Sequence, residues 1–251
     1  MKFAPKLMVF DLDGTLAESK ERMSAEMGML VSDLLKKMPV AIMSGASMQQ
    51  FEKQFLPALP REARLERLYI FPTNAAQCFM YRGGKWDLAY DNSFNEAERE
   101  VIRQALKECI DQSKFKLPEK LWGEQIEDRG AQISFSALGQ QAPVEEKEKW
   151  HTYHEVERKA LYQALVKKLP GLSIAEGGLT TIDITRKGVN KAFGVRKLPG
   201  LTGISIPEML YVGDALTEGG NDNVVIETGI KTHEVFGPGE TAKLIEDTLS
   251  H

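Results

Sequence analysis

Two carboxylates, one residue apart, directly follow a short apolar run near the start of this chain of 251 residues. The run spans residues 7–10, and the sequence then reads Asp-Leu-Asp-Gly-Thr. A short run of large apolar residues that ends at a glycine is typical of a buried parallel strand. Open α/β sheets bind their ligands at the carboxyl ends of such strands. We therefore expect Asp11 and Asp13 to point into one crevice at the edge of a parallel sheet.

Two carboxylates this close repel each other unless one of them holds a proton or a cation lies between them. The pair suits a metal-assisted reaction in which one aspartate is the nucleophile and the other is the general acid and base. The alternative is an ordinary strand that is followed by an aspartate-rich turn, which is a common structure. Further motifs in the chain are needed to distinguish a catalytic pair from an ordinary turn.

The composition is that of an ordinary globular protein, with 42% hydrophobic and 27% charged residues. The length is enough for one large domain or two modest ones. A formal net charge of −4 gives no reason to expect nucleic-acid or membrane binding, and no apolar run approaches the roughly 18 residues of a membrane span. Cys78 and Cys109 are expected to be buried thiols. With an N-terminus that leads straight into the first strand, they favour a cytoplasmic protein.

Strands and helices alternate at both ends of the chain. Strands are expected at residues 7–10, 40–43, 68–71, 209–212 and 230–232, and helices at 24–37, 48–55, 188–198 and 240–249. Such alternation predicts a parallel sheet with right-handed crossovers. Both ends of the chain would therefore contribute to one α/β domain.

The middle of the chain has a different pattern, in which hairpin strands and long helices follow one another. Strands are expected at residues 78–81, 86–90, 125–128, 132–137, 172–175 and 180–184, and helices at 95–112 and 145–169. This pattern favours a separate α+β unit. We expect a discontinuous α/β core of residues 1–83 and 182–251, interrupted by an inserted α+β domain of residues 84–181.

Polar side chains follow the core strands, or begin a core helix, at four places. They are Asp11 with Asp13, Ser44, Lys191, and Asp214 with the glycine-rich loop that contains Asn221 and Asp222. Carboxylates, a hydroxyl and a cation together fit phosphoryl transfer, with Asp11 attacking phosphorus. Ser44 and Lys191 would stabilise the charge on the transferred oxygens. Mg²⁺ is the expected cofactor, because it favours carboxylates together with phosphate oxygens. Its candidate ligands are Asp11, Asp13, Asp214 and Asp222.

These residues, in this order, resemble the motifs of the haloacid dehalogenase-like (HAD) superfamily of phosphohydrolases. That superfamily has an Asp-x-Asp-Gly-Thr motif, a Ser or Thr after a hydrophobic strand, a Lys, and a Gly-Asp…Asn-Asp motif. Here they are matched by residues 11–15, Ser44, Lys191 and residues 213–222. The resemblance implies a Rossmann-like parallel-sheet core, an aspartyl-phosphate intermediate and Mg²⁺. A large inserted α/β cap between the second and third motifs resembles subfamily IIB, which includes sugar phosphatases and phosphomannomutases.

The segments 71–74, 182–191, 218–222 and 127–139 are similar to eukaryotic-type phosphomannomutases. The resemblance implies that the substrate is contacted by Gly45, Asn74, Arg129, Gln140, Asp183 and Asn221. In that family, arginines of the cap grip the phosphate that does not react. Arg129 matches one of them, whereas Trp122 and Gln140 stand at two other such positions. Neither residue type replaces arginine in bidentate phosphate binding, so this departure favours a phosphatase over a mutase.

Single residues of this set also have ordinary structural explanations. Ser44 alone is typical of a helix N-cap, and Lys191 alone is typical of a solvated helix lysine. Asp183 fits an ordinary hinge or turn, and Arg129 fits a surface ion pair with Glu127 or Asp128. Only the combination favours the functional interpretation.

We therefore expect a Mg²⁺-dependent phosphotransferase that acts on a small phosphorylated metabolite, with a sugar phosphate as the favoured substrate. Hydrolysis is the first prediction and phosphomannomutase activity is the second. A catalytically silent binding module is the alternative from another class. The intact Asp11, Asp13, Lys191 and Asp214 count against it. No nucleic acid or membrane is expected as a partner, and a homodimer formed through the cap stays open.

Overall fold

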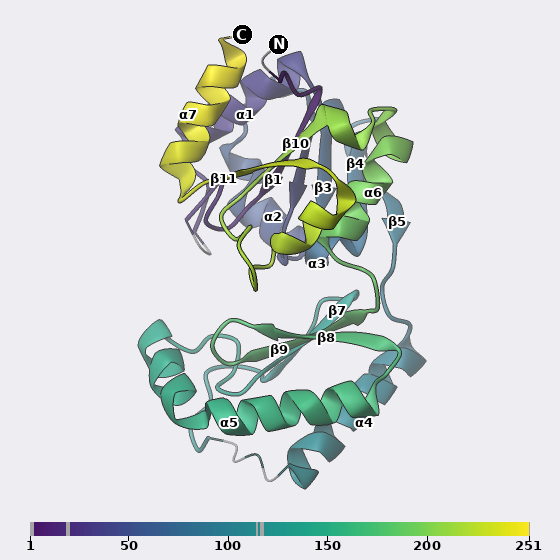
Figure 1. Cartoon of the computed structure of the whole chain (residues 1–251), viewed down its shortest axis with the longest axis vertical. Helices are drawn as coiled ribbons and strands as arrows, with labels where there is room; N and C mark the ends of the chain where they lie inside the picture. The colour runs from purple at the N-terminus through teal and green to yellow at the C-terminus, as the bar shows by residue number, and fades with distance from the viewer. Residues whose placement is uncertain (1–2, 19–20, 114, 116–117, 251) are drawn as a thin grey trace. The chain divides into compact units, whose positions relative to one another are not determined.

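The computed structural model describes residues 3–18, 21–113, 115 and 118–250, which form two compact units (Figure 1). The first, the core unit, comprises Met1–Asp91 and Val189–His251. The second, the inserted unit, comprises Asn92–Gly188. Each unit is built on a sheet of its own. Within the described ranges, no helix is both long enough and apolar enough to cross a lipid bilayer.

The core unit contains a seven-stranded sheet with the strand order β11-β10-β1-β2-β3-β4-β5. Its strands are β1 (Leu7–Asp11), β2 (Val40–Met43), β3 (Leu68–Phe71), β4 (Gln77–Arg82), β5 (Lys85–Asp91), β10 (Met209–Gly213) and β11 (Lys231–Glu234). The strands from β11 to β3 are parallel, and β4 and β5 extend the sheet with antiparallel pairing. The prediction of an α/β fold with a mostly parallel core sheet is confirmed.

Helices cover both faces of this sheet. They are α1 (Ala25–Lys37), α2 (Met48–Gln54), α6 (Lys191–Thr202) and α7 (Pro238–Leu249). Shorter connections are α3 (Pro72–Ala75), which is a turn with non-helical backbone angles, and the 3₁₀ turns η1 (Leu56–Ala58), η2 (Leu65–Arg67), η3 (Ile206–Glu208) and η4 (Asn223–Thr228). Met8 and Phe10 pack into a cluster with α1, α2 and α7. Leu7 and Val9, on the opposite face, pack with α6. All of β1 is therefore buried, which explains its unbroken apolar run.

The inserted unit contains a four-stranded antiparallel sheet with the order β6-β7-β9-β8. Its elements are α4 (Glu96–Gln112), β6 (Ile126–Asp128), β7 (Gln132–Ser136), α5 (Val144–Lys168), β8 (Leu172–Gly177) and β9 (Thr181–Arg186). One face, with Ile133, Phe135, Ile182 and Ile184, packs against the two helices (Figure 1). The alternate residues of β7 and β9 are polar, so the other face of this sheet is polar, although Gln132, Ser134 and Ser136 are buried.

The boundaries of the units lie at 91/92 and 188/189, whereas the sequence analysis placed them at 83/84 and 181/182. Strand β5 pairs with β4 along its length and therefore belongs to the core sheet. Strand β9 pairs with β7 and β8 and therefore belongs to the inserted sheet. A local pattern identifies a strand but not the sheet that it joins, since sheet membership depends on pairing with distant segments.

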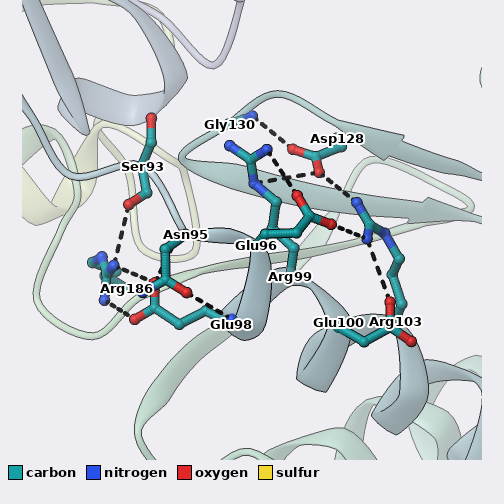
Figure 2. Close-up of polar contacts among 10 residues, drawn as sticks. All are labelled: Ser93, Asn95, Glu96, Glu98, Arg99, Glu100, Arg103, Asp128, Gly130 and Arg186. Carbon is teal, nitrogen blue, oxygen red and sulfur yellow. Dashed lines mark hydrogen bonds and ion pairs between the residues drawn. The ribbon is translucent and has the colours of Figure 1, made fainter.

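Arg186, at the end of β9, joins the two segments through which the chain enters and leaves the inserted unit (Figure 2). Its guanidinium donates to the carbonyl oxygens of Asn92 (3.0 Å) and Ser93 (3.1 Å). It also donates to both carboxylate oxygens of Glu98, at 2.9 and 2.7 Å. A bidentate arginine–carboxylate pair has a fixed orientation, so Arg186 holds the start of α4 to the end of β9.

Replacing Arg186 with alanine should loosen the segment before α4. The reporter is the amide of Phe94, which donates to the carbonyl oxygen of Gly130 at 2.9 Å. We expect its hydrogen exchange to become roughly tenfold faster, because charge-assisted hydrogen bonds to its neighbours are lost. Arg196→Ala is the matched control, since Arg196, in α6 of the core unit, also forms an ion pair with a glutamate, Glu227, at 2.9 Å. Equal exchange rates at Phe94 in both variants would contradict this role of Arg186.

Candidate active site

The candidate catalytic residues of the core unit lie at the carboxyl ends of three neighbouring strands. Asp11 is the last residue of β1, Ser44 follows β2 and Asp214 follows β10. These strands are adjacent and parallel in the order β10-β1-β2, so their carboxyl ends meet at one edge of the sheet. Lys191, the first residue of α6, reaches the same place.

Lys191 is buried between two carboxylates. Its Nζ lies 2.5 Å from Asp11 Oδ1 and 2.6 Å from Asp222 Oδ1, and only 1% of its side chain is exposed. Burial alone would lower the pKa of Lys191, but the charges of Asp11 and Asp222 outweigh it and raise the pKa. The side chain is therefore an ammonium group in the protein interior. The alternative of a solvated helix lysine is wrong.

Asp11 is held in an environment that resists its ionisation. Burial raises the pKa of Asp11 to about 7, although the ammonium of Lys191 opposes the shift. The negative charges of Asp222 and Asp214 raise it further. More carboxylate charge is therefore gathered here than the one lysine neutralises. A cation added to this site would favour the ionised form of Asp11.

Three carboxylates form a group that can hold a metal ion. Asp11, Asp214 and Asp222 each offer one oxygen atom, and these atoms lie within 4.8 Å of one another. Gly14 makes room for the group, because a Cβ at this position would lie 2.3 Å from Asp214 Oδ2. Its φ of +79° also favours glycine. Asp13, which is a metal ligand in the prediction from the sequence, is not part of this group.

Asp13 instead faces Ser44. The hydroxyl of Ser44 points to Asp13 Oδ2 at 3.4 Å and accepts a hydrogen bond from the amide of Ala46 at 3.0 Å. Ser44 is buried. The N-cap of α2 is Ser47, which forms a capping box with Gln50, so the alternative of Ser44 as that cap is wrong. The Ser44 hydroxyl therefore lies beside the carboxylate of Asp13.

A strained turn follows β3 and positions Asn74. Thr73, Asn74 and Ala75 all have left-handed backbones, with φ of 49°, 54° and 65°. This conformation is costly, above all for the β-branched threonine. In this conformation the backbone N–H of Asn74 donates a hydrogen bond to the backbone carbonyl oxygen of Ser44, at 2.9 Å. A Cβ on Gly45 would lie 3.6 Å from Asn74 Nδ2, so these two candidate substrate contacts lie side by side.

Tyr211, in β10, is a polar residue of this site that the sequence analysis counted only as part of an apolar strand. Its hydroxyl donates to Asp222 Oδ1 at 2.6 Å, and the residue is fully buried. A buried phenol usually has a hydrogen-bond partner, and this is the signal that points to it. Asn221, a predicted substrate contact, is exposed beside Asp222.

The polar face of the inserted sheet carries the remaining candidates. Glu127, Ser134 and Asp183 are cross-strand neighbours on β6, β7 and β9. Ser134 donates to Asp183 Oδ1 at 2.6 Å, and burial raises the pKa of Asp183. Arg129 donates to Glu127 Oε2 at 2.7 Å, so its charge is balanced by that carboxylate.

Gln140 and Trp122, which stand at the expected positions of cap arginines, have different surroundings in the inserted unit. Gln140 Nε2 makes long hydrogen bonds to the carbonyl oxygens of Ser134 (3.3 Å) and Gln125 (3.4 Å). Trp122 packs against the hydrophobic cluster on the helix side of the sheet, and Lys120 Nζ lies 4.7 Å from the centre of its ring. Trp122 therefore contributes to the packing of the inserted unit.

The model of the eukaryotic phosphomannomutase family matches residues 27–251 of the chain. The chain belongs to the eukaryotic phosphomannomutase family. It is 27% identical to a probable phosphomannomutase of Caenorhabditis elegans, over 97% of this chain and 95% of that protein. It is 26% identical to the phosphomannomutase of Saccharomyces cerevisiae, over 97% and 94%. The family resemblance expected from the sequence is confirmed.

Two solved structures have a fold that is similar to the fold of this chain. A haloacid dehalogenase-like hydrolase from Bacteroides thetaiotaomicron has a TM-score of 0.68 and 15% sequence identity, with 97% of this chain and 99% of that chain covered. An IMP-nucleotidase of Plasmodium falciparum has a TM-score of 0.66 and 18% identity, with 99% and 69% covered. The HAD-like fold is therefore confirmed.

Removing the charge of Asp11 should make the metal-free protein more stable at neutral pH. In the folded chain Asp11 keeps its proton up to about pH 7, whereas an unfolded aspartate loses it near pH 3.9, roughly. Between these values the unfolded state binds fewer protons, so the wild-type protein loses stability as the pH rises. Asp11→Asn has no such titration.

The gain in unfolding free energy of Asp11→Asn over the wild type should therefore grow from pH 5 to pH 8, by at least about 1 kcal/mol. Urea unfolding in EDTA measures it. Asp33→Asn, at a half-exposed position of α1 where the carboxylate pairs with Lys36, is the control and should show the same small effect at both pH values. A gain for Asp11→Asn that shrinks as the pH rises would contradict the raised pKa.

Proposed function

We propose that the chain is a Mg²⁺-dependent phosphotransferase that hydrolyses a sugar monophosphate through an aspartyl-phosphate on Asp11. One observation carries the proposal. The buried ammonium of Lys191 lies between Asp11 and Asp222, with Asp214 close enough to share a metal ion. A nucleophilic carboxylate, a fixed cation and a metal-binding carboxylate group are the parts that phosphoryl transfer requires.

The donor set fits Mg²⁺, because carboxylate oxygens are the hard ligands that this ion prefers. Asp11, Asp214 and Asp222 would hold it, and the bound ion supplies positive charge for the oxygens of the transferred group. The surplus negative charge around Asp11, which raises its pKa, supports a bound cation independently of the family.

In the first step an oxygen of Asp11 forms a bond to phosphorus, and the bond from phosphorus to the sugar oxygen breaks. Asp13 gives its proton to that leaving oxygen. Lys191 and Ser44 stabilise the charge of the phosphoryl oxygens. In the second step Asp13 takes a proton from water, whose oxygen attacks phosphorus. The Asp11 carboxylate is released together with inorganic phosphate.

The charge of the inserted sheet supports hydrolysis over mutase activity. A mutase has to retain a bisphosphate, which needs positive charge for the phosphate that does not react. On the polar face of β6, β7 and β9, Arg129 pairs with Glu127, and Asp183 adds a second carboxylate. Gln140 is uncharged and Trp122 is packed on the other face. This surface offers little surplus charge to a second phosphate.

Phosphomannomutase activity is the second candidate. It is favoured by the family model and by relatives that are named phosphomannomutases over nearly their whole length. The two candidates share the first chemical step on Asp11. They differ in whether water or a hydroxyl of the retained sugar phosphate receives the phosphoryl group. A homodimer formed through the inserted unit and a cytoplasmic location remain predictions for either candidate.

Wild-type protein incubated with mannose 1-phosphate or glucose 1-phosphate, plus a trace of the 1,6-bisphosphate, should release free phosphate rather than form the 6-phosphate. EDTA should stop the release, Mg²⁺ should restore it, and Asp11→Asn should lack it. Gln140→Arg should bind the bisphosphate about tenfold more tightly, because it adds one charge-assisted contact. Gln141→Arg is the matched control for the added charge. Efficient formation of the 6-phosphate by the wild type would establish the mutase instead.

Asp13→Asn should be impaired most with substrates that have poor leaving groups. A sugar alkoxide needs the proton that Asp13 supplies, whereas an aryl oxide leaves without it. In single-turnover phosphorylation of Asp11, the loss with a sugar phosphate should exceed the loss with an aryl phosphate by about 100-fold, the lower range for general acid catalysis. Equal losses with both substrates would assign the proton to another group.

A further inference from the structure

The hydroxyl of Tyr211 is a buried polar group of the active site that the proposed mechanism does not use. Tyr211 lies in β10, two residues before Gly213, and is completely buried. Its hydroxyl donates to Asp222 Oδ1 at 2.6 Å. The same oxygen accepts from Lys191 Nζ at 2.6 Å, and Lys191 in turn donates to Asp11 at 2.5 Å. A continuous chain of hydrogen bonds therefore leads from the phenol to the nucleophile.

The two oxygens of Asp222 are used in different ways. Oδ1 receives two short hydrogen bonds, one from Lys191 and one from Tyr211, and these occupy the two lone pairs of a carboxylate oxygen. Oδ2 receives a longer bond from the amide of Ala215, at 3.3 Å. A cation that binds Asp222 is therefore restricted to Oδ2.

We propose that Tyr211 is a positioning residue for phosphoryl transfer. Its hydroxyl fixes the carboxylate of Asp222, so that Oδ1 holds Lys191 Nζ against Asp11 and only Oδ2 remains for a cation. This inference rests on the proposed function of the site. Without the hydroxyl, Asp222 loses one of its hydrogen-bond donors. Lys191 is then the only side-chain donor to Oδ1 and is drawn away from Asp11 towards Asp222.

Burial keeps this hydroxyl a donor. It raises the pKa of Tyr211 well above the usual value, and the charges of Asp222 and Asp11 add to the shift. The ring itself packs in the cluster between the sheet and α6. Phenylalanine preserves that packing, so Tyr211→Phe isolates the hydroxyl.

Two measurements on Tyr211→Phe test the proposal. The rate of Asp11 phosphorylation in a single turnover should fall by about tenfold or more, while KM changes less than about threefold, because Tyr211 is completely buried. The dissociation constant for Mg²⁺, from calorimetry without substrate, should stay the same or fall, because a lone pair of Asp222 Oδ1 becomes available.

Tyr69→Phe is the matched control. Tyr69 is a buried tyrosine of β3 that pairs with Ala41 and Met80, and its variant should keep the wild-type values.

An unchanged phosphorylation rate in Tyr211→Phe would overturn the proposal. So would a Mg²⁺ affinity that falls in step with the rate, because Tyr211 would then support the metal ligands as a whole. If Tyr211→Phe fails to fold by circular dichroism, 3-fluorotyrosine at position 211 replaces it. This residue keeps the hydroxyl and should keep the rate within about threefold, and a tenfold loss would contradict the proposal. A wild type without any phosphotransfer would reject the proposed function, while the Mg²⁺ titration would still test the role of Tyr211.

Discussion

The ion pairs of Lys191 with Asp11 and Asp222 are the interaction on which the core unit depends. An ammonium that is taken out of water needs nearby carboxylates, and removal of Lys191, the cation shared by both pairs, would leave buried carboxylates unpaired at a cost of about 3–5 kcal/mol. The three partners come from β1, the first residue of α6 and the loop after β10. They meet only when β10 lies next to β1 and α6 begins at the carboxyl edge of the sheet. The site and the strand order therefore require each other.

The same edge of the sheet concentrates features that cost stability. Asp11, Asp214 and Asp222 repel one another, and the turn from Thr73 to Ala75 is left-handed throughout. Such features persist only where the surrounding structure determines them. Here the surroundings are strands β1, β2 and β3, which are completely buried between helices on both faces. The buried strands between two layers of helices therefore hold a strained and charged edge.

Much of the fold and of the catalytic edge could be predicted from the sequence, because their signals are local. Unbroken apolar runs predict the parallel strands, and polar residues directly after them predict the site. The sequence missed what depends on distant segments or on backbone angles. Strands β5 and β9 were assigned to the wrong side of a boundary, since pairing decides their sheet. The left-handed turn at Asn74 contains no glycine, which is the residue that would have indicated such a backbone in the sequence. The role of Tyr211 depends on Asp222, which lies eleven residues further along the chain.

Membership of the phosphomannomutase family and the proposed hydrolysis are compatible, because both outcomes would share the proposed chemistry of Asp11. After the first step, the fate of the phosphoryl group depends on how long the sugar is retained. A loss of 1.4 kcal/mol in binding shortens that retention by about tenfold. In this chain Glu127 shares the charge of Arg129, and Gln140 has none to offer. Under the proposed function, the balance between transfer to water and transfer to a sugar therefore depends on a few side chains of the inserted sheet. These can change while the ion pairs of the core unit, on which the proposed aspartyl-phosphate depends, stay the same.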